Sequence, residues 1–279
     1  MIEIRGLCKD YGQIKAVDNL DLTIQQGEIF GLLGPNGAGK TTTVRILTTL
    51  ARPTAGEVFI NGWEVTRQAS HVKKEIGVVP QHINLDQELS AWENLELHGR
   101  LYRIPRGERR ARTQELLAFV GLHDRASTPV EHFSGGMKRR LMIARALMHR
   151  PRTLFLDEPT VGLDPQVRRR LWDLIRSLNG QGITILLTTH YIEEAEALCH
   201  RVGILNRGRL IALGTPEELK ARVGRVVVEV PNQNETEYRV FENREQALQY
   251  AAALDRDVVI RESNLEDVFV ELTGHKVGD

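Results

Sequence analysis

An octapeptide near the start of the chain restricts the possible folds more than any other feature. Residues 34–41 read Gly-Pro-Asn-Gly-Ala-Gly-Lys-Thr, which matches the phosphate-loop pattern G-x-x-x-x-G-K-[ST] in full. Glycines let several backbone N–H groups approach one phosphate, the lysine adds a positive charge, and the threonine hydroxyl can bind Mg²⁺. An apolar strand over 29–33 and a helix over 42–50 provide the expected context. The sequence therefore predicts a nucleotide phosphate site whose contacts are Gly34, Pro35, Asn36, Gly37, Ala38, Gly39, Lys40, Thr41 and Thr42.

A second apolar strand, over 153–156, ends in two consecutive carboxylates. Asp157 is placed to hold Mg²⁺ through water together with Thr41. Glu158 is placed to polarise the water that attacks the γ-phosphate of ATP. Two acids at this position are also a common way to end a strand and cap a helix. Their occurrence together with the phosphate loop is what favours ATP hydrolysis.

The rest of the chain divides by pattern into three kinds of segment. Alternating apolar residues and an Asn-Gly turn at 61–62 predict antiparallel strands in the first 65 residues. Residues 84–150 favour helices. Apolar strands then alternate with helical stretches over 153–205, which predicts a mostly parallel sheet with helices on its faces. Residues 220–279 are expected to form a small α+β accessory segment after a main domain over 1–219.

The sequence Phe-Ser-Gly-Gly-Met at 133–137 lies before the two acids and makes the pattern specific. Counted from Ser134, it precedes Asp157 by 23 residues, and it is similar to the signature sequence of ATP-binding subunits of ABC transporters. The resemblance covers about residues 1–219 and implies a P-loop NTPase core with an inserted helical subdomain. In that family the Ser134 hydroxyl and the amides of Gly135 and Gly136 would contact the γ-phosphate held by the opposite subunit. A serine N-cap and a helix N-terminus suit that anion.

The same resemblance assigns roles to four further residues. Gln81 would touch Mg²⁺ or the attacking water and link the core to the helical subdomain. Asp164 would cross the dimer interface, although Asp before Pro is also a good helix N-cap. His190 would contact the γ-phosphate, and Tyr11 would stack on adenine.

Two positions depart from the common signature. The family more often has Leu at the position of Phe133 and Gln at that of Met137. Losing the glutamine removes one polar contact, so nucleotide affinity or dimer lifetime is expected to differ.

The resemblance also implies partners. Two copies, or one copy and a related ATPase, would close head to tail around two MgATP molecules. A separate integral membrane permease would dock on residues 84–102 and place the protein at the cytoplasmic face of the membrane. Trp92 and Leu95 would belong to that docking surface, with core packing as the alternative for these two side chains. The segment Asn-Leu-Glu-Asp-Val-Phe-Val-Glu-Leu-Thr-Gly at 264–274 resembles a tail of the branch that exports drugs, polysaccharides and lipid-linked molecules. It predicts an amphipathic helix with Leu265, Val268, Phe269 and Leu272 on one face.

Charge and composition bear on the alternatives. The 37 basic and 37 acidic residues balance, which disfavours a chain built to wrap nucleic acid. A soluble ABC-type ATPase acting on DNA or ribosomes, and a P-loop kinase, remain alternatives, the second disfavoured by Ser134–Gly136 and His190. Cys8 and Cys199 fit neither a metal site nor a disulfide framework, which favours a reducing cytosol. The start of the chain shows no signal-peptide pattern, and the apolar stretches are too short to span a bilayer.

Overall fold

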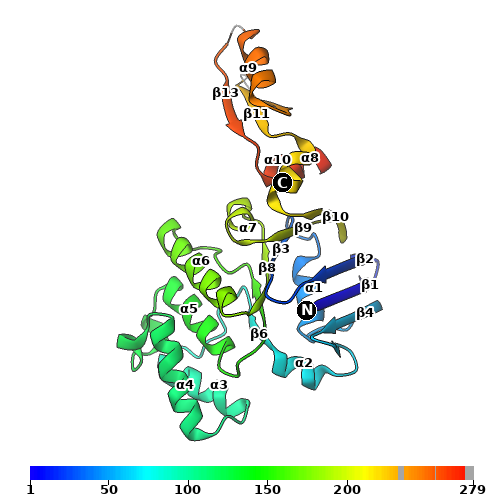
Figure 1. Cartoon of the computed structure of the whole chain (residues 1–279). Helices are drawn as coiled ribbons and strands as arrows, with labels where there is room; N and C mark the ends of the chain where they lie inside the picture. Colours follow the sequence, from blue (N-terminus) through cyan, green and yellow to red (C-terminus); the bar gives the residue numbers. More distant parts are fainter. Residues whose placement is uncertain (232–235, 255, 274–279) are drawn as a thin grey trace.

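The computed structural model describes residues 1–231, 236–254 and 256–273, and a six-stranded sheet forms its centre (Figure 1). The strand order is β10-β9-β3-β8-β7-β6, parallel except for the edge strand β10. The strands are β3 (Ile29–Leu33), β6 (Ile76–Val79), β7 (Thr153–Asp157), β8 (Thr184–Thr189), β9 (Arg201–Asn206) and β10 (Arg209–Gly214). The predicted α/β class with a mostly parallel sheet is confirmed.

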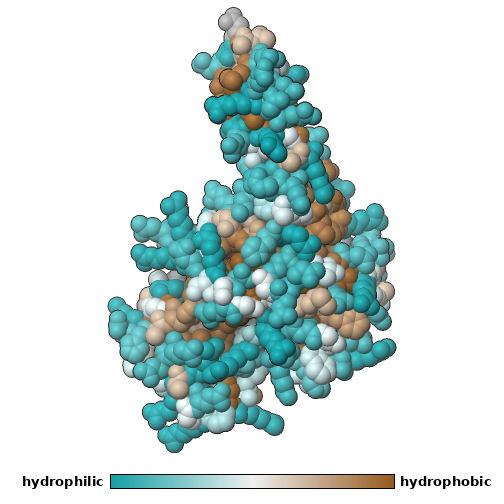
Figure 2. All heavy atoms as spheres, in the orientation of Figure 1, coloured by the Kyte–Doolittle hydropathy of each residue, from teal (hydrophilic) through white to brown (hydrophobic). Residues whose placement is uncertain are grey.

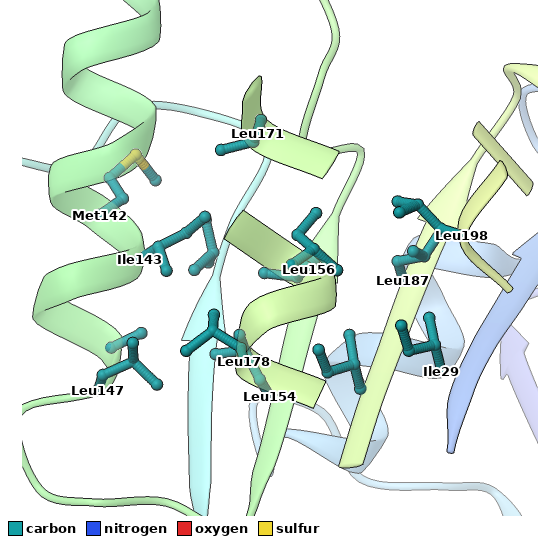
Figure 3. Packing of buried hydrophobic residues seen from close by; sticks show 14 of the residues in the cluster. Ile29, Met142, Ile143, Leu147, Leu154, Leu156, Leu171, Leu178, Leu187 and Leu198 are labelled. Atoms are coloured by element: carbon teal, nitrogen blue, oxygen red, sulfur yellow. The ribbon is translucent and has the colours of Figure 1, made fainter. Parts of the chain in front are cut away.

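Both faces of this sheet are covered, which explains why its central strands are buried at every position rather than at alternate ones. Leu154 and Leu156 of β7 pack into one core, whereas Phe155 between them packs into the core on the opposite face. Figure 3 shows the first core, where strand residues meet side chains from the flanking helices. Each fully buried leucine there contributes about 1.5–3 kcal/mol relative to an exposed one. Continuous burial therefore fixes the strands, and their carboxyl ends, in place.

A four-stranded antiparallel sheet of order β2-β1-β4-β5 covers the second face, together with α1 (Lys40–Leu47). Its strands are β1 (Ile2–Tyr11), β2 (Ile14–Ile24), β4 (Ala55–Ile60) and β5 (Trp63–Glu64). The predicted turn at 61–62 is present, with φ of 50° at Asn61 and 85° at Gly62. Helix α2 (Ala69–Glu75) then leads into β6.

Helices make up most of the segment between β6 and β7. They are α3 (Ala91–Leu101), α4 (Arg106–Phe119) and α5 (Gly135–Ala146), with short 3-10 turns at His123–Arg125 and Val130–His132. Ser90 and Glu93 form a reciprocal capping box at the start of α3. Leu95 is fully buried, so the expectation that it contributes to a docking surface is wrong. It faces inward because the apolar stripe of α3 packs against α4 and α5.

Three helices connect the later strands: α6 (Pro165–Gly180), α7 (Ile192–Leu198) and α8 (Pro216–Val223). Asp164 caps α6 by accepting a bond from the Val167 amide at 3.0 Å. Thr215 and Glu218 form a capping box on α8, as the Thr-Pro-Glu-Glu sequence there predicts. Helices α6 and α7 lie over the same face of the sheet as α5 (Figures 1 and 3).

The last part of the described chain projects from the body (Figure 1). It contains a three-stranded antiparallel sheet of order β12-β11-β13 with its own small core. Its elements are β11 (Val226–Pro231), β12 (Thr236–Phe241), α9 (Arg244–Ala252), β13 (Val259–Glu262) and α10 (Leu265–Thr273). The main-domain boundary at 219 stays a prediction, and residues 274–279 lie outside the described residues.

Helix α10 returns to the body and packs on α7 and α8. Leu265, Val268 and Phe269 are buried there, but Leu272 is 47% exposed. The predicted amphipathic helix is therefore present, and the exposed Leu272 is its penultimate residue. The segment 264–274 ends at Gly274, which lies outside the described residues.

None of the helices in the described ranges combines the length and apolar composition that crossing a bilayer requires. The face of the molecule in Figure 2 is mainly hydrophilic.

Candidate functional site

The carboxyl ends of neighbouring parallel strands bring four distant segments together. Leu33, just before the phosphate loop, pairs with Thr189, just before His190. Asp157 pairs with Thr188 in the next strand, and β6 places Gln81 beyond its own end, beside β7. Ligand sites of open α/β sheets form at this edge because all the loops there leave from strands pointing the same way.

A cleft of about 520 Å³ opens at this edge. Its lining includes residues 36–42 of the phosphate loop, Gln81 and Glu158. It also includes Ile14, Lys15, Ala16 and Arg207, which the sequence did not single out.

Two glycines of the loop are required for different reasons. Gly39 has φ of 105°, and a Cβ there would lie 2.4 Å from the carbonyl oxygen of Ala16. Gly37 has φ of 80°, but a Cβ there would meet no atom of the chain within 4 Å. The backbone conformation alone therefore favours glycine at position 37, whereas position 39 also lacks space for a side chain.

Lys40 is buried and its ammonium folds back over the loop. Its Nζ donates to the carbonyl oxygens of Gly34 at 2.6 Å and Pro35 at 3.0 Å. Burial lowers the pKa of the Lys40 ammonium, and the charges of Glu158 and Asp157 oppose that shift. The two carbonyl acceptors hold the Lys40 side chain inside the cleft, where a phosphate would be its natural partner.

Glu158 is the centre of the polar cluster in the cleft. One carboxylate oxygen lies 3.1 Å from Nδ1 of His190 and 3.9 Å from Nζ of Lys40. The other accepts a bond from Nε2 of Gln81 at 3.2 Å. Glu158 is only 6% exposed and has a left-handed φ of 48°, an unusual backbone state that is common at active sites. The structure therefore brings together the three side chains for which the sequence predicts catalytic roles.

Thr188 connects the two adjacent acids. Its hydroxyl donates to Oδ1 of Asp157 at 2.6 Å, and the Glu158 amide donates to its carbonyl oxygen at 3.1 Å. Asp157, Thr41 and Gln81 offer the oxygen ligands that Mg²⁺ prefers. The described residues contain no group of three His, Cys, Asp or Glu side chains suited to a metal ion. A magnesium ion held by Asp157, Thr41 and Gln81 would take further ligands from phosphate and water, as this ion usually does in nucleotide sites.

The signature residues lie outside this cleft. Ser134 caps α5 by accepting a bond from the Met137 amide at 3.3 Å, and both Ser134 and Gly135 are exposed. Gly136 is buried, and a Cβ there would lie 2.4 Å from Cγ1 of Val167. Gly136 therefore permits close packing of α5 on α6.

Gln81 is tied to the signature helix. Arg139 of α5 donates to the carbonyl oxygens of Pro80 at 2.8 Å and Gln81 at 3.0 Å. Burial lowers the pKa of the Arg139 guanidinium, and the charges of Glu194 and Asp157 oppose the shift. A displacement of Gln81 would thus be transmitted to the helix that carries Ser134.

Tyr11 is not among the residues that line the cleft. It ends β1, is 46% exposed, and its ring lies 4.8 Å from Nζ of Lys9. Its partner across the β1–β2 turn, Ile14, lines the cleft instead. The stacking of Tyr11 on adenine therefore stays a prediction, made at the hairpin that also supplies Ile14 to the cleft.

Arg207 lines the cleft from the turn between β9 and β10. Gly208 in this turn donates to the carbonyl oxygen of Ala38 at 3.0 Å, which holds the turn against the phosphate loop. No motif marks this arginine, because its position depends on packing between segments about 170 residues apart.

Comparisons with known proteins agree with this geometry. Residues 17–161 match the family described as ABC transporter. A daunorubicin resistance ATP-binding protein of Streptomyces coeruleorubidus is 43% identical over 98% of this chain and 96% of its own length. A Nod factor export ATP-binding protein of Cupriavidus metallidurans is 43% identical over 100% of this chain and 99% of its own. A dimeric ATP-binding cassette in a post-hydrolysis state, bound to ADP and phosphate, is 32% identical, with a TM-score of 0.69 over 77% of this chain and 98% of that one.

The fold of this chain is thus that of an ATP-binding cassette. The chain belongs to the ABC transporter family, as an ATP-binding subunit that hydrolyses ATP.

Proposed function

We propose that two copies of this chain close head to tail around two MgATP molecules and drive export through a separate membrane permease. One observation supports the proposal: the residues predicted to contact the nucleotide do not all line one cleft. The cleft holds Lys40 and Glu158, whereas Ser134 is exposed at the start of α5 and absent from the cleft lining. A second subunit supplies the missing half.

The exposed end of α5 is suited to a phosphate. Free N–H groups and the partial positive charge of the helix N-terminus favour an anion there. No acidic residue occupies the first turn of α5 to oppose it. Asp164 is exposed nearby in the loop before α6, where it would reach the interface. The dimeric cassette to which this chain is similar supports closure between two copies.

In the closed dimer each residue of the cleft has a distinct task. Lys40 and the loop amides hold the phosphates, and Thr41, Asp157 and Gln81 would hold Mg²⁺, which supplies charge neutralisation on the β- and γ-phosphates. Glu158 accepts a proton from the attacking water, and His190, 3.1 Å from the Glu158 carboxylate, contacts the γ-phosphate and orients that carboxylate. Loss of the γ-phosphate removes the bridge between the halves and lets the dimer open.

The names of the relatives support export, and the exposed side chains of α3 support a permease partner. The two relatives are named for drug resistance and for Nod factor export, and both align along nearly the whole chain, including the C-terminal unit. On α3, Leu97 and Leu101 are 46% and 73% exposed, and Trp92 is half-buried. We infer that these side chains, rather than Leu95, meet the permease. The protein would then act at the cytoplasmic face of the membrane, bound through that permease.

The arginine-rich runs do not favour the nucleic-acid alternative. Arg109 is 9% exposed and bonds Glu96 at 2.7 Å, and Arg112 pairs with Glu115 at 2.6 Å. Arg168 pairs with Glu193 at 3.7 Å. These arginines serve packing and ion pairs within the chain.

Ser134→Arg tests the shared site. We expect the variant to bind ATP with an affinity within about twofold of the unmodified chain, since Ser134 lies outside the cleft that holds the phosphate loop, and to lose the ATP-dependent dimer, because a bulky cation would block closure. Light scattering with MgATP in a slow-hydrolysis background measures the dimer. Ser177→Arg, at an exposed position on α6, is the matched control. An unchanged dimer in the Ser134 variant would count against the shared site.

Arg207→Ala tests the residue that sequence motifs did not reveal. Removing a cation from the cleft lining is expected to weaken ATP binding by about 3- to 10-fold, the range of one exposed charge contact. Arg209→Ala is the control, because Arg209 pairs with Asp18 at 2.6 Å and is not among the lining residues. Equal affinities in the two variants would remove Arg207 from the nucleotide site.

A further inference from the structure

Glu194 is a fully buried acid outside the cleft, and the ATPase chemistry gives it no task. It lies in the first turn of α7, four residues after His190. Its Oε1 accepts two bonds, from the Thr160 hydroxyl at 2.8 Å and from the Trp172 indole N–H at 3.2 Å. A buried carboxylate is costly unless it is paired, so these contacts require an explanation.

The two donors stand on either side of the loop at 161–164 that carries Asp164. Thr160 is the last residue before the loop and is fully buried. Trp172 lies on α6, the helix that Asp164 caps. One carboxylate oxygen therefore holds both the entry to the loop and the helix that follows it.

On its other side, Glu194 is linked through α7 to His190. The Tyr191 amide donates to the Thr189 hydroxyl at 2.9 Å, and α7 begins at the next residue. The Tyr191 ring lies 4.3 Å from the His190 ring and 4.6 Å from the guanidinium carbon of Arg168 on α6. The segment that contacts the γ-phosphate and the loop that reaches the partner are thus packed together around Glu194.

The Glu194 carboxyl experiences burial and several hydrogen-bond donors at once. Burial raises the pKa of the Glu194 carboxyl, while the hydroxyls of Thr189 and Thr160, the Trp172 indole and the Arg168 charge oppose that rise. Burial is thus the largest influence on this carboxyl, and the Thr160 and Trp172 donors reach Oε1 only, while Oε2 has no hydrogen-bond partner within the described residues.

We propose that Glu194 is a positioning residue that couples His190 to the loop 161–164, so that γ-phosphate loss in one site is passed through Asp164 to the site shared with the partner. The inference rests on the proposed head-to-tail dimer. It adds a specific route between the two sites: His190, α7, Glu194, Thr160 and the loop. Without the carboxylate the residues on either side of the loop lose their two hydrogen bonds to α7, although the Arg168–Glu193 ion pair and the cleft residues stay in place.

Steady-state ATP hydrolysis against ATP concentration tests the coupling in the full-length chain. We expect Glu194→Ala to lower kcat about 10- to 100-fold, because two hydrogen bonds to one buried acceptor are lost, and to reduce the Hill coefficient from near the site number, about 2, toward about 1. Binding of ATP, measured by equilibrium dialysis, should change by less than about twofold, because the cleft is untouched. Glu194→Gln keeps an acceptor oxygen and is expected to restore most of both quantities.

Two further variants make the result specific. Thr160→Val removes one donor with little change of shape and should lower the Hill coefficient in the same way. The double variant Glu194→Ala/Thr160→Val should be no worse than Glu194→Ala alone, since both changes break the same bond. Glu217→Gln alters an acid on α8 whose side chain is 84% exposed, and should leave kcat and the Hill coefficient unchanged.

The outcomes separate this inference from the proposed function. If the unmodified chain hydrolyses ATP cooperatively but Glu194→Ala and Thr160→Val keep its Hill coefficient, the coupling is overturned and the dimer stands. Additive losses in the double variant would also overturn it. If Glu194→Ala does not fold, Thr160→Val alone tests the coupling: a lowered Hill coefficient supports it and an unchanged one overturns it. A noncooperative unmodified chain that forms no dimer with ATP contradicts the proposed function itself.

Discussion

Glu158→Gln is expected to lower steady-state ATP hydrolysis about 100-fold or more while ATP binding persists, because general-base catalysis typically supplies a factor of 10²–10⁴. Glutamine fills the same space next to His190 and Gln81 but cannot accept a proton from the attacking water. ATP then persists between the two halves, and the chain should accumulate as an ATP-bound dimer. Phosphate release and light scattering measure the two effects on one sample.

The matched control for this variant is Glu115→Gln, an exposed acid on α4 far from the cleft. Its hydrolysis rate and its dimer fraction should equal those of the unmodified chain. Rapid steady-state hydrolysis by Glu158→Gln would show that another group is the base.

Lys40→Ala is expected to abolish nucleotide binding at accessible ATP concentrations, with an affinity loss of about 100-fold or more, because a buried cation paired with phosphate contributes several kcal/mol. The substitution also removes the bonds from Nζ to Gly34 and Pro35 that hold the loop closed on itself. Equilibrium dialysis with labelled ATP measures the loss. Lys138→Ala, a lysine on α5 outside the cleft lining, should bind normally. Retained ATP binding by Lys40→Ala would contradict the assignment of the phosphate loop.

The main site could be predicted from sequence because its parts are short, local and placed at strand ends. The phosphate loop and the Asp157–Glu158 pair each follow an apolar strand, and parallel pairing then aligns their ends. The N-caps at Ser134 and Asp164 were equally predictable, since capping depends on three or four consecutive residues.

The features that the sequence did not reveal depend on contacts between segments that are distant along the chain. Leu95 and Leu97 have the same apolar character, and only the packing of α3 on α4 and α5 decides that the first is buried and the second half exposed. Arg207 reaches the cleft because the turn between β9 and β10 is hydrogen-bonded to Ala38 of the phosphate loop. Glu194 reads in the sequence as one of several acids on a helix, and its two bonds appear only once α6 and α7 are packed.

The central claim is that each ATP is held between the phosphate loop of one copy and the signature helix of the other. A crystal structure of Glu158→Gln with MgATP tests it most directly. We expect a two-fold dimer in which the Ser134 hydroxyl and the Gly135 amide of one subunit lie within hydrogen-bond distance of the γ-phosphate bound by Lys40 of its partner. A nucleotide enclosed by a single subunit, with Ser134 of every copy remote from any phosphate, would contradict the account.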